Sequence, residues 1–189
     1  MSTTGPLDHL QQVQELNRVF LGLLQTRVRE QRSSLGLPLA VRPPLRTASP
    51  DLLDALARFP GALFRLASGS RPRAPHDPDA AYDVAEHDLC LSILLAARHT
   101  SRLSVYQARL LFGLEQAEIA RLGALPLPDL QRLACTAGLL QCAFHERPWF
   151  WHKLLTATRP EVRRQLTLMA LQPRIALPWP HRKPPQSSA

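Results

Sequence analysis

The chain has 189 residues, of which 45% are hydrophobic and 20% are charged, and this balance excludes a disordered chain and predicts a soluble globular one with a real core. No apolar run approaches the ~18 residues that span a bilayer, and residues 1 to 6 lack the basic start and apolar stretch of a secretion signal. We therefore expect a cytoplasmic protein with no membrane partner.

The formal net charge is +8, and the distribution of the charged residues along the sequence is more informative than the total. Residues 147 to 189 hold eight lysines and arginines against one acid, whereas residues 86 to 146 hold five against six. Arginine outnumbers lysine 21 to 2, which is typical of a GC-rich genome as well as of phosphate binding. The total charge alone is therefore a weak argument for a nucleic-acid partner.

The first half of the chain predicts a helical region over residues 8 to 67. From Leu7 to Glu30, apolar residues recur at steps of three and four, which is typical of a long amphipathic helix. Residues 32 to 49 lose this period and contain three prolines, so we expect an irregular connection. Ser49-Pro50-Asp51 begins a second helix, and Pro60-Gly61 ends it. Residues 68 to 81, rich in proline, serine and glycine, predict a linker.

Residues 82 to 172 predict a second helical domain. A long helix is expected from Tyr82 to about Arg98, and shorter ones over residues 104 to 111, 115 to 122 and 128 to 137. Residues 139 to 144 fit a short strand, a turn or another helical piece. Thr158 and Glu161 have the spacing of a capping box before a helix that ends near Leu171. Residues 173 to 189, basic and rich in proline, predict a disordered tail.

The stretch from Asp88 to Phe144 carries a family resemblance. Its spacing and composition resemble FlhD, the D subunit of the bacterial flagellar master transcription regulator, over residues 84 to 172, and the register holds without a gap from Asp88 to about Leu139. The residues that carry it are Asp88, Leu91, Ser92, Leu94, Leu95, Ala97, Ala108, Gly113, Ala124, Leu125, Leu127, Pro128, Leu133, Ala134, Thr136 and Leu139.

The resemblance implies an all-α, small multi-helix module that acts in a hetero-oligomer. In the family, a zinc-bearing C-type partner is thought to supply most of the DNA recognition at flagellar promoters, and the D subunit supports the assembly. Two departures stand out. The family's Phe-Arg-Leu-Gly motif corresponds to Leu110-Leu111-Phe112-Gly113 in this chain, which lacks the arginine. Some D subunits have a cysteine that links two subunits, and the corresponding residue here is Gln141, with Cys142 beside it.

The two halves of the chain also resemble each other weakly. Leu21 to Gln25 match Leu94 to Arg98 at an offset of 73, and Pro50-Asp51-Leu52 match Pro128-Asp129-Leu130 at 78. Residues 8 to 67 would then be a decayed second copy, and the chain an intramolecular pseudo-dimer, since an isologous homodimer is easily fused through a linker. Alternatively, the abundance of Leu, Ala, Pro and Arg produces these matches by chance.

No set of residues indicates catalysis or a cofactor. His87 with Cys90, and Cys142 with His145, hold zinc-binding atoms, but neither pair has the spacing of a zinc finger. A Cys142 and His145 pair three positions apart does not set up nucleophilic attack, and we find neither a glycine-rich phosphate loop nor a paired-acid site. We predict no enzyme, no metal, no cofactor and no small-molecule substrate. All three cysteines, including Cys135, are expected to be small buried residues.

The candidate sites are therefore surfaces. Residues 104 to 122 look like a helix-turn-helix, but Glu115 and Glu118 would face phosphates badly. Candidate phosphate contacts are basic residues near the C-terminus, whose alternative is a solvated helix face and tail: Arg159, Arg163, Arg164, Arg174, Arg182 and Lys183. Candidate partner contacts are apolar: Leu91, Leu94, Leu95, Trp149 and Trp151. The function expected is transcription regulation with a C-type partner; the alternative is an interaction module that binds or sequesters a regulator without contacting DNA.

Overall fold

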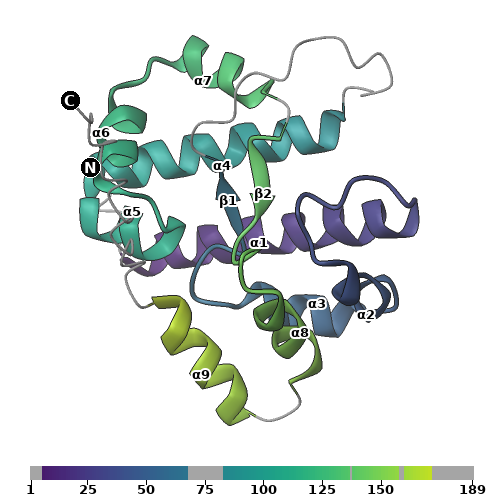
Figure 1. Cartoon of the computed structure of the whole chain (residues 1–189). Helices are drawn as coiled ribbons and strands as arrows, with labels where there is room; N and C mark the ends of the chain where they lie inside the picture. The colour runs from purple at the N-terminus through teal and green to yellow at the C-terminus, as the bar shows by residue number, and fades with distance from the viewer. Residues whose placement is uncertain (1–5, 68–82, 137, 158–159, 172–189) are drawn as a thin grey trace, which may run out of the picture.

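The computed structural model describes residues 6 to 67, 83 to 136, 138 to 157 and 160 to 171, and it is mainly helical (Figure 1). The elements in chain order are α1 (Pro6–Arg29), η1 (Leu39–Val41), α2 (Arg42–Arg46), α3 (Pro50–Ala57), β1 (Phe64–Leu66), α4 (Val84–Leu103), α5 (Val105–Phe112), α6 (Gln116–Ala124), α7 (Leu127–Ala134), β2 (Leu140–Cys142), α8 (Pro148–Thr156) and α9 (Pro160–Leu171). The predicted helical fold is confirmed, and a small sheet is added to it.

Two of the predicted helix starts are confirmed, whereas Tyr82 and the Thr158 capping signal lie outside the described residues. The Ser49 hydroxyl accepts a hydrogen bond from the backbone N–H of Leu52 at 3.3 Å and caps α3. Ser104 caps α5 in the same way through Gln107, at 3.2 Å. Each cap satisfies a first-turn N–H that has no partner inside its own helix.

The connection between residues 32 and 49 is more regular than predicted, because it contains η1 and α2. Pro43 and Pro44 lie in the first turn of α2, where a missing N–H costs nothing since first-turn donors are unpaired in any helix. The prediction of an irregular connection is therefore wrong for residues 39 to 46. Pro148 similarly begins α8, which the sequence did not assign.

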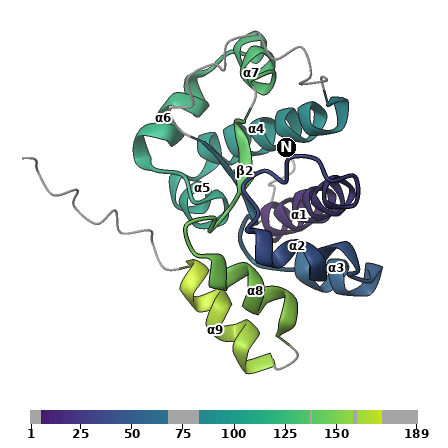
Figure 2. The same cartoon turned by 45° about the vertical axis from the view of Figure 1, so that its right-hand side comes forward.

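Two long antiparallel helices, α1 and α4, lie side by side at the centre of the molecule (Figures 1 and 2). His9, near the start of α1, lies beside His99 near the end of α4, with ring centroids 5.7 Å apart. At the other end, Arg27 of α1 meets Asp83 just before α4. The short helices α2 and α3 pack on α1, and α6 and α7 pack on α4.

A two-stranded antiparallel sheet joins the first half of the chain to the second. Arg65 of β1 is opposite Gln141 of β2. The pairing extends beyond the strands, because Ala67 N–H donates to the Leu139 carbonyl and Ala143 N–H to the Leu63 carbonyl, both at 2.8 Å. The strand alternative for residues 139 to 144 is thus the one that the structure adopts.

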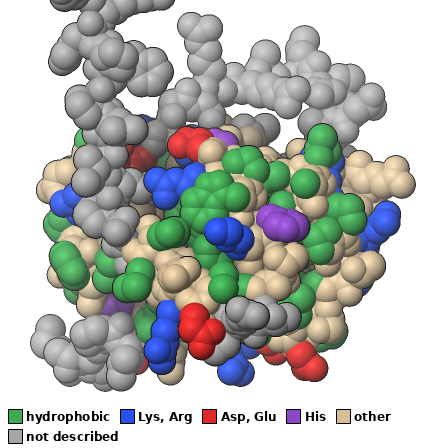
Figure 3. Space-filling view, turned by 60° about the horizontal axis from the view of Figure 1, so that its bottom comes forward, with side chains coloured by type: hydrophobic (Ala, Val, Ile, Leu, Met, Phe, Trp, Pro, Cys, Tyr) green, Lys and Arg blue, Asp and Glu red, His purple; other side chains and the backbone are tan. Residues whose placement is uncertain are grey.

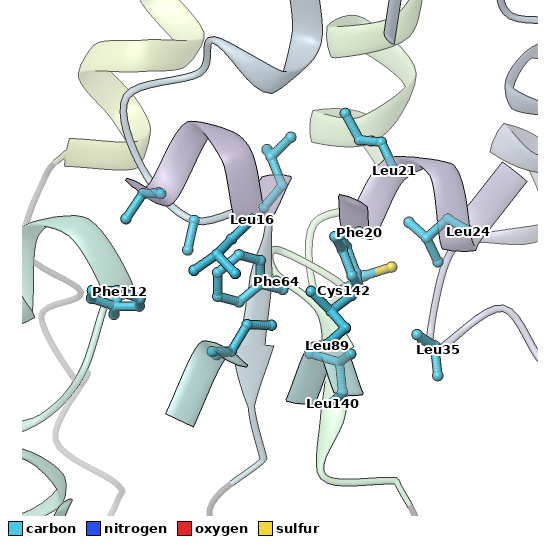
Figure 4. Packing of buried hydrophobic residues seen from close by; sticks show 14 of the residues in the cluster. Leu16, Phe20, Leu21, Leu24, Leu35, Phe64, Leu89, Phe112, Leu140 and Cys142 are labelled. Atoms are coloured by element: carbon cyan, nitrogen blue, oxygen red, sulfur yellow. The ribbon is translucent and has the colours of Figure 1, made fainter. Parts of the chain in front are cut away.

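The sheet and the two long helices share one hydrophobic cluster (Figure 4). Phe20 of α1 lies edge-on to Phe64 of β1, with ring centroids 5.8 Å apart, and Phe64 also meets Phe112 of α5 at 6.4 Å. Leu140 and Cys142 of β2 complete this part of the core. Residues predicted as two regions, 8 to 67 and 82 to 172, therefore share a single core. The predicted linker, residues 68 to 81, and tail, residues 173 to 189, lie outside the described residues.

A buried asparagine fixes the path from α3 to β1. The Asn17 side chain donates to the Gly61 carbonyl at 3.0 Å, with longer contacts to Ala57 and Phe59, and it accepts from the Leu63 N–H at 2.8 Å. An unpaired buried amide is costly, so this bonding confines the segment to one course. The sheet register follows from where that segment enters β1.

Arg27 performs a similar role at the far end of α1. Its buried guanidinium donates to Asp83 at 2.6 Å, to Glu86, and to the Ser33 carbonyl at 3.1 Å. Asp83 also contacts Arg32 at 3.1 Å and caps α4 through the backbone N–H groups of Ala85 and Glu86. One charged network thereby connects the end of the first long helix to the start of the second.

Candidate functional site

The residues from which the sequence predicts a family resemblance include several on the surface of α4. Asp88, Ser92 and Leu95 are exposed and follow one another at steps of four and three, so they form a single solvent-facing line on the helix, here called the α4 stripe. Core packing does not explain these three side chains. Leu95, 39% exposed, is the apolar member of the stripe.

The other predicted partner contacts on α4 belong to the core. Leu94 is fully buried, and Leu91 is partly buried and packed against the hydrophobic cluster. Both side chains contact the chain's own interior and so hold α4 in place. Leu95 is therefore the predicted partner contact on α4 that is exposed.

The aromatic pair on α8 divides in the same way. Trp151 is fully buried, and its indole N–H donates to the Ala143 carbonyl at 2.6 Å, beside the sheet. Trp149 is exposed, and the Lys153 ammonium lies 5.4 Å from the centroid of one of its rings. Trp151 thus anchors α8 to the body of the molecule, whereas Trp149 is available on its surface.

Figure 3 shows the face at the bottom of Figure 1, toward which α8 and α9 extend. Hydrophobic side chains gather in the middle of this face, with lysine or arginine and histidine side chains among them.

Most of the predicted phosphate contacts lie outside the described residues: Arg159, Arg174, Arg182 and Lys183. Arg163 falls within α9, but its side chain is not among those described. Arg164 is exposed on α9, as phosphate contact would require. Of this set, Arg164 is therefore the residue whose side chain the structure places.

The cysteines are set apart by burial. Burial raises the pKa of the Cys90 thiol to about 12, with further contributions from Glu86 and Cys135, and burial raises the pKa of Cys142 as well. Cys135 is exposed, which contradicts the expectation that all three are buried. Within the described ranges, no three His, Cys, Asp or Glu side chains are grouped as a metal site would need.

The two short helices α5 and α6 do meet at a left-handed glycine, Gly113, with φ of +65°. However, the first turn of α6 is acidic and self-contained, because the Glu118 carboxylate accepts from the Glu115 N–H at 2.7 Å in a capping box. A major-groove reading helix needs donors and cations at that end. Two short helices and a glycine turn are thus present, but the first turn of the second helix lacks the chemistry of a reading helix.

One surface was missed by the sequence reasoning. Three apolar side chains, Leu103, Val105 and Tyr106, are exposed around Ser104, where α4 turns into α5. Ser104 was used only as a capping signal. The sequence does contain a signal for this surface: apolar residues directly flank the capping serine and do not fit the helical period.

Comparison with protein-family models, with curated protein sequences and with solved structures finds no match to this chain. Across the described part of the chain, no helix combines the length and the apolar character that a bilayer span requires.

Proposed function

We propose that this chain is a non-enzymatic, cytoplasmic subunit of a transcription regulator, which binds a C-type partner and acts with it at flagellar or similar motility promoters. The observation that carries the proposal is the α4 stripe. Asp88, Ser92 and Leu95 carry the resemblance to the FlhD family and are exposed along one line, where a partner can contact them. Residues matched only by a shared core would be buried instead.

The proposal includes an internal duplication, which the order of elements supports. Each half starts with a long helix, continues through short helices and ends in a strand: α1, α2, α3 and β1, then α4, α6, α7 and β2. α7 begins and ends 77 positions after α3, and β2 begins and ends 76 positions after β1. α5 is an addition, because positions 77 earlier hold the end of α1 and the turn at Leu35.

Side-chain contacts repeat at similar spacings. Arg29, in the last turn of α1, donates from Nε to the carbonyl of Arg46 at the end of α2, at 3.2 Å. Arg102, in the last turn of α4, donates from Nε to the carbonyl of Gly123 near the end of α6, at 3.0 Å. The arginines are 73 positions apart and the acceptors 77, and chance similarity of composition gives no reason for a matched contact.

Backbone features add to this support. Gly36 and Gly113, 77 positions apart, both have positive φ, +82° and +65°. Ala62 N–H donates to Leu111 and Cys142 N–H to Leu35, both at 2.7 Å, so each strand region bonds to the turn of the other half. The acceptors are 76 positions apart, although the donors are not equivalent. Reciprocal contacts of this kind are typical of an isologous interface.

A second candidate function is an interaction module that binds or sequesters a regulator without contacting DNA. The acidic first turn of α6 favours it, because the capped Glu115 and Glu118 would face phosphates. In both functions the chain binds another protein. They differ in whether the complex that contains it still binds a promoter.

Co-purification with a C-type subunit encoded nearby tests the shared step. We expect Leu95→Glu to abolish co-purification, because a charge would replace the apolar member of the α4 stripe. Val19→Glu is the matched control, since Val19 is 55% exposed on α1, and it should leave co-purification intact. Failure of the unmodified chain to co-purify, or equal loss in both variants, would refute the proposal.

Promoter binding by the purified complex separates the two functions. For a regulator, affinity should fall steeply with salt, and deleting residues 173 to 189 should make that dependence shallower, since fewer cations are released from the DNA. If DNA binding by the partner is unchanged or blocked by this chain, the interaction module is correct. Sedimentation equilibrium tests the duplication: a pseudo-dimer is a compact monomer, and a stable homodimer contradicts it.

A further inference from the structure

The junction between α4 and α5 carries exposed apolar side chains on a sharp corner. Leu103 is the last residue of α4, and Val105 and Tyr106 are the first two of α5. Leu103 is 56% exposed and Tyr106 is 73% exposed, and Val105 is exposed as well. Single exposed apolar residues are ordinary, but three within four positions are a local concentration, here called the α4–α5 corner.

Hydrogen bonds hold the α4–α5 corner against the body of the molecule. The Ser104 N–H donates to the Thr100 carbonyl at 2.8 Å, its hydroxyl accepts from Gln107 at 3.2 Å, and its carbonyl accepts from the Ala108 N–H at 3.0 Å. Thr100 and Ala108 are both fully buried, so these bonds attach the corner to the core. A surface that is already ordered loses little conformational entropy when a partner binds.

The charge around the α4–α5 corner is positive. No acidic residue occurs between Asp88 and Glu115 in the sequence, a stretch that contains Arg98, Arg102 and Arg109. Arg109 follows Tyr106 by three positions and Val105 by four, so it shares their face of α5. Arg102 and Arg109 are exposed, and among the described residues neither takes part in an ion pair.

Acids on the neighbouring helices are few: Glu15 of α1 is exposed, and others already interact within the chain. α1, α4 and α6 pack against α5. Asp8 of α1 and Glu118 of α6 already interact within the chain. Arg121 of α6 is exposed and adds a further cation. The α4–α5 corner thus combines an apolar centre with basic surroundings.

We propose that the α4–α5 corner is a docking surface for an acidic amphipathic helix of a partner protein. The apolar stripe of such a helix would cover Leu103, Val105 and Tyr106, and its carboxylates would meet Arg102 and Arg109. Apolar burial supplies affinity and charge supplies orientation in this mode of recognition. A nucleic acid would pair with the arginines, but it would leave the aliphatic Leu103 and Val105 without apolar partners.

The α4–α5 corner shares no residue with the α4 stripe, and the inference does not depend on the proposed function. The probe is a synthetic, fluorescently labelled helical peptide with apolar residues at i, i+3, i+4 and i+7 and glutamate on its polar face. A peptide with lysine in place of glutamate and a scrambled acidic peptide are the comparisons. Fluorescence anisotropy against the full-length chain measures binding.

We expect saturable binding of the acidic amphipathic peptide alone. Tyr106→Ser and Leu103→Ser should each weaken it about tenfold or more, as loss of a central apolar contact does, and Arg109→Glu should weaken it as well. Leu39→Ser is the matched control, because Leu39 is also 73% exposed but lies on η1, and it should change affinity less than twofold. Circular dichroism confirms that each variant remains folded.

Several outcomes would overturn the proposal. They are no saturable binding, equal binding of the lysine or scrambled peptide, or an equal effect of Leu39→Ser. If a DNA duplex displaces the peptide, and Tyr106→Ser weakens the binding of that duplex, the α4–α5 corner binds nucleic acid instead. A homodimer in sedimentation that Tyr106→Ser dissolves would assign it to self-association.

Discussion

Replacing Arg27 by methionine tests how the ends of the two long helices are joined. Methionine keeps much of the aliphatic length of arginine but removes the charge that Asp83 and Glu86 share. Both carboxylates are mostly buried, with side chains 12% and 21% exposed, so in the variant they would lie in a poorly hydrated place without the Arg27 cation. Arg32 would still reach Asp83 from a more exposed position.

The expected loss follows from that partial burial. Removing one partner of a fully buried ion pair costs about 3–5 kcal/mol, and the remaining solvent access and Arg32 place this site at the lower end, about 3 kcal/mol. For a chain of this size, that corresponds to a fall of about 6–12 °C in Tm. Chemical denaturation, followed by circular dichroism, gives the free energy of unfolding directly. A loss below about 1 kcal/mol would refute the view that Arg27 is a central contact.

Acid provides an independent measurement of the same network. Burial by itself raises the pKa of Asp83, but hydrogen bonds from Arg27 and Glu86 and the charges of Arg27 and Arg32 outweigh it, so the pKa is lowered overall. A lowered pKa in the folded state means that ionised Asp83 stabilises the fold above the ordinary carboxyl pKa, and that this contribution is lost as the pH falls through the lowered value. Arg27→Met should flatten this part of the pH dependence. An unchanged acid slope would contradict the argument.

Five further substitutions test the fold. Asn17→Leu should cost about 2–3 kcal/mol in the free energy of unfolding, because the Leu63 N–H and Gly61 carbonyl lose their buried partner; a neutral result would mean that water replaces the amide. Gly22→Ala should stabilise α1 by about 0.5–1 kcal/mol, because the added methyl group meets open space. Gly36→Ala should destabilise the fold by about 1 kcal/mol, because the φ of Gly36 is +82°. The same denaturation assay should show changes of opposite sign in the free energy of unfolding. Trp151→Phe should lower stability by about 2–3 kcal/mol through the lost bond to Ala143, and Trp149→Phe, as its exposed control, should be nearly silent.

Local signals in the sequence predicted much of the helical framework. The period of α1 and the caps at Ser49 and Ser104 depend on neighbours within one or two turns, so they can be recognised without the fold. The helices η1 and α2 were not predicted, because proline inside a helix usually ends it. Pro43 and Pro44, however, occupy positions in the first turn of α2, which tolerate proline.

Contacts between distant residues were beyond local reasoning. The sheet pairs residues more than seventy positions apart, so neither three-residue strand has a convincing pattern by itself. Leu94 and Leu95 are adjacent and chemically identical, yet one is in the core and the other in solvent, because the position of α1 and β1 decides which side of α4 is covered. The sequence therefore limits which residues can be exposed, but it does not show which of them lie on the surface.

The shared sheet has a consequence for how this chain can be divided. Each half supplies one strand and one long helix, so neither half alone would complete the hydrophobic cluster. A cut between residues 67 and 83 would keep the Asn17 contacts within the first piece, but it would place the two paired strands on different pieces. We therefore expect the two pieces to be insoluble when made separately and to reassemble when made together, which would make this chain a natural candidate for fragment complementation.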